Sequence, residues 1–95
     1  MNAKEYKDAA ARLCCIACRH DGYYDTPAEL HHPREGQGMG QRASDYDVIP
    51  LCPAHHNGTD HPRTPSIHLD KRKFIARYGT EAELLAEVRA LMEKR

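Results

Sequence analysis

The pattern of apolar and polar positions predicts a helix at the start of this 95-residue chain. The apolar side chains recur there at the spacing of one helix face: Tyr6, Ala9, Ala10 and Leu13. Asn2 followed three residues later by Glu5 resembles a capping box. The pattern therefore predicts a helix over residues 1–13. A tight knuckle from Cys14 to Gly22 follows, ended by the turn-forming letters HDG.

Two short segments further along the chain have the composition of strands. The segment TPAELHHP is bounded by Pro27 and Pro33, and the segment YDVIPLC comes after a glycine-rich stretch. That stretch, REGQGMGQRASD, has no apolar periodicity and predicts an exposed loop. The letters PAHHNG then begin a short helix, with Pro53 near its first turn.

The C-terminal third predicts two consecutive helices. Asp70 is a plausible cap for a helix over KRKFIARY, which ends at Gly79. Thr80 and Glu83 form a capping box for the last helix. Its apolar stripe consists of Leu84, Leu85, Val88, Leu91 and Met92. We interpret this stripe as core packing rather than as a partner groove.

Composition narrows the class of protein. A chain of 95 residues buries only a modest fraction of its surface on folding and often needs a metal ion or disulfides for stability, and this chain has four cysteines and seven histidines. No signal peptide is visible, and the most apolar run, AAARLCCIAC, is too short to span a bilayer. We therefore expect a cytoplasmic protein without membrane contact, in which clustered cysteines bind metal rather than form disulfides. The formal net charge of zero does not indicate nucleic-acid binding.

Two pairs of residues have the spacing of zinc ligands. Cys15 and Cys18 form C-x-x-C, and Cys52 and His55 form C-x-x-H. Two such knuckles can supply four ligands to a structural zinc ion with tetrahedral geometry. Cys14 offers an alternative C-x-x-x-C spacing with Cys18. The other interpretations are a redox C-x-x-C pair or simply buried thiols.

The remaining histidines exceed what one zinc site needs. His31 and His32 are neighbours on a predicted strand, so their side chains point to opposite faces. His55 and His56 are neighbours on a helix, where successive residues diverge by roughly 100°. In each pair one ring can bind a metal while the other faces a different site. This arrangement predicts a second, catalytic metal beside the zinc.

The segments ELHHP, GQRASDYD and VIPLCPAHH resemble the HNH endonucleases, which have the ββα-metal (His-Me finger) fold. Within this group the chain more closely resembles the small phage and prophage nucleases related to the RecA-dependent recombination-enhancement nuclease. The resemblance runs from about Cys15 to His68 and includes the tail FIARYGTEAELLAEV. It implies one α+β domain over 1–95, with an N-terminal helix (1–13), a zinc-stabilised ββα-metal core (14–68) and a C-terminal helical pair (69–95).

The resemblance also implies roles for individual residues. His32 matches the general base, and three histidines match ligands of the catalytic metal: His31, His56 and His68. His61 and Asp60 are alternatives to His68. Asp47 stands where HNH enzymes often carry asparagine, a residue that orients the loop of the general base.

The implied function is a metal-dependent DNA endonuclease linked to recombination, with DNA or RecA-coated DNA as its partner. The catalytic ion is Mg²⁺, Mn²⁺, Zn²⁺ or Ni²⁺, and the residues do not decide among them. The candidate phosphate contacts are Arg34, Arg42, Arg63, Lys71, Arg72 and Lys73. The alternatives are a non-catalytic zinc module that contacts nucleic acid or a partner protein, and a small redox protein built on Cys15 and Cys18.

Overall fold

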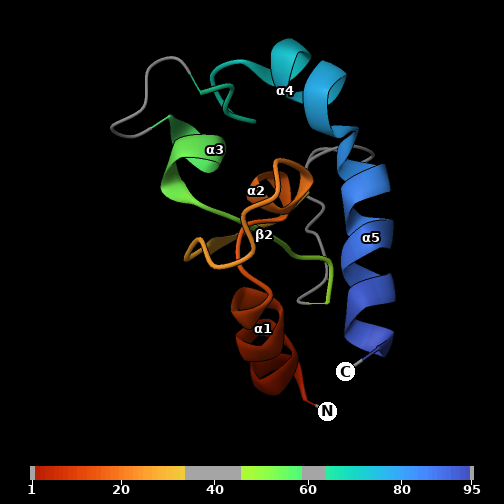
Figure 1. Ribbon diagram of the computed structural model, residues 1–95. Coiled ribbons are helices and arrows are strands. Elements are labelled where there is room, and N and C mark those ends of the chain that lie inside the picture. The colour runs from red at the N-terminus through yellow and green to blue at the C-terminus, as the bar shows by residue number, and fades with distance from the viewer. Residues whose placement is uncertain (1, 34–45, 59–63, 95) are drawn as a thin grey trace.

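The computed structural model describes residues 2–33, 46–58 and 64–94 (Figure 1). In chain order the elements are α1 (Ala3–Arg12), α2 (Ile16–His20), β1 (Glu29–His31), β2 (Ile49–Leu51), α3 (Pro53–Asn57), α4 (Lys71–Tyr78) and α5 (Glu81–Glu93). They form a small α+β fold. Six of these seven elements lie in segments where the sequence pattern predicted a helix or strand, whereas α2 occupies the segment that was expected only as a tight knuckle. The glycine-rich stretch lies outside the described residues.

The sheet of the described chain is a single antiparallel pair in the order β1–β2. Glu29 pairs with Leu51, and His31 pairs with Ile49. All three residues of β2 are buried, because α1, α2, α3 and α5 all contact this strand. The sheet is therefore the centre of the fold. Strand β1, which carries His31, contacts α1 and α3.

Helix α1 begins with the predicted cap. The side-chain oxygen of Asn2 accepts a hydrogen bond from the backbone N–H of Glu5 at 2.8 Å. The Glu5 carboxylate accepts from the side-chain amide of Asn2 at 2.8 Å. This contact replaces the backbone half of a capping box, because the asparagine amide offers a second donor near the glutamate.

The two C-terminal helices follow the sequence signals with one difference. Helix α4 starts after Asp70, whose side chain makes no capping hydrogen bond. Helix α5 has the full capping box: Glu83 N–H donates to the Thr80 hydroxyl at 3.1 Å, and Thr80 N–H donates to the Glu83 carboxylate at 3.0 Å. Figure 1 shows α5 as the long helix along one side of the molecule.

The core lies between the sheet and the helices. Its largest fully buried apolar side chains include Phe74, Ile16, Ile49, Leu51, Leu84 and Val88. Leu85, Leu91 and Met92 are partly buried against this cluster, so the stripe of α5 does pack into the core as interpreted from the sequence. Among the described helices, none combines the length and the apolar character that crossing a membrane requires.

Candidate metal centres

The first cluster joins the knuckle of α2 to the start of α3. Nδ1 of His55 lies 3.5 Å from Cys15 Sγ, 3.6 Å from Cys18 Sγ and 3.2 Å from Cys52 Sγ. The Cys18 and Cys52 sulfurs are 3.9 Å apart. Zn–S bonds of about 2.3 Å and a Zn–N bond of about 2.0 Å imply ligand separations of roughly 3.5–3.8 Å in a tetrahedron. The four donor atoms therefore fit a structural zinc ion.

The local structure explains why these four residues meet. Cys15 caps α2, and its sulfur accepts from the backbone N–H of Cys18 at 3.4 Å. Cys52 occupies the corresponding position before α3, with Pro53 opening the helix. In both cases a spacing of three residues returns the second ligand to the side of the first within one helical turn.

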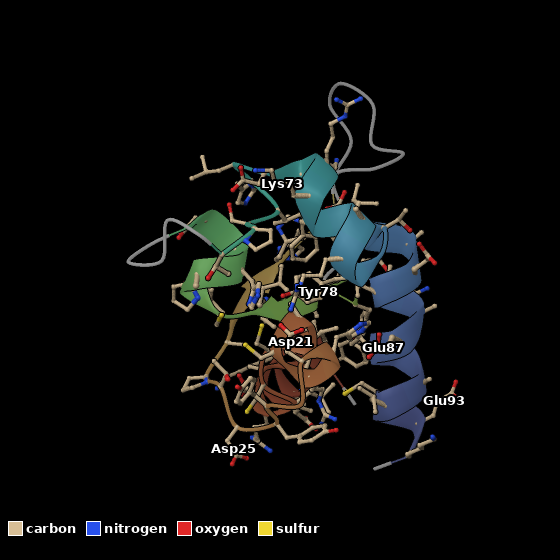
Figure 2. The ribbon with its side chains drawn as sticks, turned by 45° about the horizontal axis from the view of Figure 1, so that its top comes forward. Asp21, Asp25, Lys73, Tyr78, Glu87 and Glu93 are labelled. Atoms are coloured by element: carbon tan, nitrogen blue, oxygen red, sulfur yellow. The ribbon has the colours of Figure 1, made fainter. Side chains whose placement is uncertain are left out.

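A hydrogen-bond chain defines which nitrogen of His55 can bind a metal. The Tyr78 hydroxyl lies 3.0 Å from His55 Nε2 and 2.7 Å from Asp21 Oδ2. Because an ionised Asp21 can only accept, the hydroxyl donates to Asp21 and accepts from Nε2–H. This tautomer leaves a lone pair on Nδ1, which faces the three sulfurs. Figure 2 shows Asp21 and Tyr78 side by side between α2 and α4.

Arg77 stabilises the hydrogen-bonded series that runs from His55 through Tyr78 to Asp21. Arg77 donates to Asp21 at 2.9 Å and to the Tyr78 oxygen at 3.0 Å. Partial burial acts to raise the pKa of Asp21, but the hydrogen bonds from Tyr78 and Arg77 hold that pKa below its ordinary 3.8. Burial and the Asp21 contact raise the pKa of Tyr78 to about 12. At neutral pH the hydroxyl therefore keeps the proton that it donates.

The sulfur environment favours a bound cation. Burial raises the pKa of the Cys15 thiol to about 12, and it also raises the pKa of Cys18. A buried thiolate needs a positive charge beside it, which a divalent ion supplies when it binds. Cys14 is not in this cluster; its sulfur lies 3.6 Å from the Arg12 carbonyl oxygen. Of the two spacings left open by the sequence, the geometry favours the one that starts at Cys15.

The second cluster consists of His31, His56 and His68, whose donor atoms all lie within 4.8 Å of one another. The ring centroid of His31 lies 5.1 Å from that of His56 and 5.2 Å from that of His68. The three imidazoles come from β1, from α3 and from the segment before α4. Three protein ligands with open positions are typical of catalytic rather than structural metal sites.

The return of the chain after α3 brings His68 to this cluster. Ile67 N–H donates to the His55 carbonyl at 2.8 Å, and His68 N–H donates to the His56 carbonyl at 3.3 Å. Carbonyl groups in the last turn of a helix have no partner within the helix, so the returning segment satisfies them. Gly58 ends α3 with φ +80°, a conformation that favours glycine.

Two carboxylates contact the histidine cluster from outside. Nε2 of His31 lies 2.5 Å from Glu81 Oε2, and both side chains are almost fully buried. Nδ1 of His56 lies 2.7 Å from Glu29 Oε1. Burial lowers the pKa of His31 below its ordinary 6.5, an effect that the Glu81 hydrogen bond opposes. His31 therefore carries a neutral ring at neutral pH, the form that binds metals.

The other predicted site residues lie around these clusters. His32 follows β1 and is exposed. Asp47 precedes β2, and its carboxylate accepts a hydrogen bond from Arg89 of α5. Exposed basic residues form the first turn of α4: Lys71, Arg72 and Lys73. Lys73 is labelled on this helix in Figure 2. The remaining candidates lie outside the described residues: Arg34, Arg42, Asp60, His61 and Arg63.

Several residues of these sites were missed by the sequence analysis. Glu29 lies two residues before His31 and therefore on the same face of β1, a signal that strand periodicity could have provided. Glu81 and Tyr78 lie on helices far from the ligands in sequence, and no motif announces them. Their roles depend on how α4 and α5 pack against the sheet.

These features define a class of protein: a small α+β domain with one Cys₃His cluster and one histidine cluster, each suited to a metal ion. Residues 1–93 match the sequence profile of a family described as "Recombination enhancement, RecA-dependent nuclease". The chain belongs to this family.

A relative is the uncharacterised protein YdfU of Escherichia coli (strain K12), which is 38% identical over 61 residues. The match covers 64% of this chain but about 15% of the length of YdfU. The similarity to YdfU thus concerns a small part of a longer protein.

Proposed function

We propose that the chain is a metal-dependent DNA endonuclease of the HNH (ββα-metal) type, acting in recombination. The observation that carries the proposal is the meeting of His31, His56 and His68 in a chain that belongs to a nuclease family. The order β1–β2–α3, with one ligand on β1 and another on α3, agrees with a ββα-metal core.

The proposal assigns a different task to each cluster. Cys15, Cys18, Cys52 and His55 would hold a structural zinc ion that keeps α2 against α3. His31, His56 and His68 would hold the catalytic ion. When bound, a divalent cation at the histidines supplies Lewis-acid stabilisation of the negative charge that develops on the phosphate.

His32 is the proposed general base. A neutral imidazole can take a proton from water near neutral pH. Its neighbour His31 is a buried member of the histidine cluster, whereas His32 itself is exposed and open to substrate. His32 would remove the proton from the water that attacks phosphorus, while the bond between phosphorus and the leaving oxygen breaks. The leaving oxygen would take a proton from solvent, and His32 would release its own proton to solvent.

Other residues would bind the DNA substrate and orient the general base. Lys71, Arg72 and Lys73 would contact DNA phosphates, because they are exposed on α4 and α4 follows His68 directly. Asp47 would orient the segment that connects His32 to β2, with its carboxylate anchored on Arg89. RecA-coated DNA is the proposed partner, on the basis of the family description.

A plasmid-nicking experiment tests the assignment of His32. We expect His32→Ala to lower the nicking rate of supercoiled DNA, in Mg²⁺ or Mn²⁺ and with or without RecA, by roughly 10²- to 10⁴-fold. The matched control is His20→Ala, since His20 is also exposed but pairs with Glu87 of α5. Equal nicking by wild type and His32→Ala would refute the general base.

A further inference from the structure

A buried contact joins Glu81 of α5 to His31 of the histidine cluster. Glu81 is 1% exposed, in the first turn of α5, and its two oxygens have separate partners. Oε2 lies 2.5 Å from His31 Nε2, and Oε1 lies 3.6 Å from Lys71 Nζ. A buried carboxylate is costly unless it is paired, and the contacts with His31 and Lys71 offset the cost of burying an ionised Glu81.

A neutral imidazole has one nitrogen that donates and one that accepts. The nitrogen that faces an ionised carboxylate carries the hydrogen, so Nε2 of His31 is the donor toward Glu81. Nδ1 of His31 then has the free lone pair that a metal ligand needs.

Glu29 makes an equivalent contact with His56, but with Nδ1 of the ring rather than Nε2. Its Oε1 lies 2.7 Å from Nδ1 of His56, which leaves the lone pair of His56 on Nε2. Glu29 and His31 lie on one face of β1, so the same strand face supplies a ligand and the carboxylate that orients another ligand.

We propose that Glu81 and Glu29 are positioning residues that fix the tautomers of His31 and His56, so that a divalent cation is bound by His31 Nδ1 and His56 Nε2. The inference rests on the proposed function, because it concerns the ion of the histidine cluster. Carboxylates in this position orient the ring and raise its basicity as a ligand. Glu81 also places α5 in contact with the site, although α5 contributes no ligand of the cluster.

The competing interpretation is that the buried pair merely clips α5 to β1. The chain offers a matched control for it, the contact between His20 Nε2 and Glu87 Oε1 at 2.7 Å. This pair also joins α5 to another element, but His20 and Glu87 do not belong to either metal cluster. Glu87→Gln therefore removes a histidine–carboxylate contact of α5 without touching the proposed ligands.

The first experiment measures Ni²⁺ affinity by isothermal titration of the zinc-loaded protein, because imidazole ligands suit Ni²⁺. We expect Glu81→Gln and Glu29→Gln to weaken Ni²⁺ binding by roughly 10- to 100-fold, and Glu87→Gln to leave it unchanged. Wild-type affinity in both Glu81→Gln and Glu29→Gln would overturn the inference. Failure of wild type to bind Ni²⁺ beyond its zinc would instead overturn the proposed catalytic ion itself.

The second experiment does not depend on how the variants fold. Long-range ¹H–¹⁵N NMR of the wild-type zinc protein without Ni²⁺ reports the tautomer of each ring. At about pH 8, above the ordinary histidine pKa of about 6.5, we expect the Nε2–H form of His31 and the Nδ1–H form of His56. The reverse tautomer at either ring would overturn the inference.

Discussion

His55 and His56 are consecutive residues of α3, yet they belong to different clusters. Nδ1 of His55 lies 3.2 Å from Cys52 Sγ, whereas the ring centroid of His56 lies 5.1 Å from that of His31 and 4.7 Å from that of His68. The cause is the helical rotation of roughly 100° per residue. Sequence reasoning could predict this division, because it depends only on the local helix.

Cys14 and Cys15 are also neighbours of which only Cys15 belongs to a cluster, and substituting each of them in turn tests the proposed zinc ligands. Cys14 has φ +66°, a backbone conformation that favours glycine. We expect Cys14→Gly to keep its zinc and to leave the free energy of unfolding unchanged or higher by about 1 kcal/mol. Cys15→Ala should lose the zinc. Elemental analysis and urea denaturation measure both effects, and zinc loss in Cys14→Gly would contradict the assignment.

At the scale of elements, the capping box of α5 sets the position of Glu81, which contacts His31 of the histidine cluster. The box of Thr80 and Glu83 defines where the helix begins, and the first helical residue is Glu81. The hydrogen bonds from Thr80 lower the pKa of Glu83 below its ordinary 4.5. This contribution to stability is therefore present above pH 4.5 and is lost as the pH falls through the lowered value.

Removing the cap should weaken the helix and, with it, the placement of Glu81. We expect Thr80→Ala to lower the free energy of unfolding by about 1 kcal/mol, because an N–H of the first turn loses its partner. Thr80→Ser keeps the hydroxyl and serves as the control. Urea denaturation of the zinc-loaded protein measures the difference, and equal stability of the two variants would contradict the role of the box.

At the scale of the whole molecule, we expect the histidine cluster to depend on the Cys₃His cluster through α3. This helix has five residues, too few to be stable alone, and it carries a ligand of each cluster. A zinc ion on the Cys₃His cluster would attach α3 to α2, and structural zinc contributes on the order of 10 kcal/mol in small modules. The histidine cluster should therefore form only in the zinc-loaded protein.

The metal content of two variants tests whether the histidine cluster requires bound zinc. With Zn²⁺ and Ni²⁺ supplied, we expect two ions per chain in wild type and one in His56→Ala, with its helical circular dichroism retained. Cys52→Ala should lose both ions and its helical signal, because the zinc that holds α3 is gone. A folded Cys52→Ala protein that still binds Ni²⁺ at the histidines would show that the sites are independent.

Local sequence patterns were enough to predict most of the helices and strands, the candidate zinc ligands at their C-x-x-C and C-x-x-H spacing, and the separation of neighbouring histidines. These are local properties, governed by the periodicity of helix and strand and by capping residues. Helix α2 was expected only as a tight knuckle. The packing of the folded chain brings Glu81, Glu29 and Tyr78 into contact with the candidate ligands and pairs Asp47 with Arg89. The physical reason is that most of these contacts join residues far apart in the chain, so they exist only once α4 and α5 have packed against the sheet.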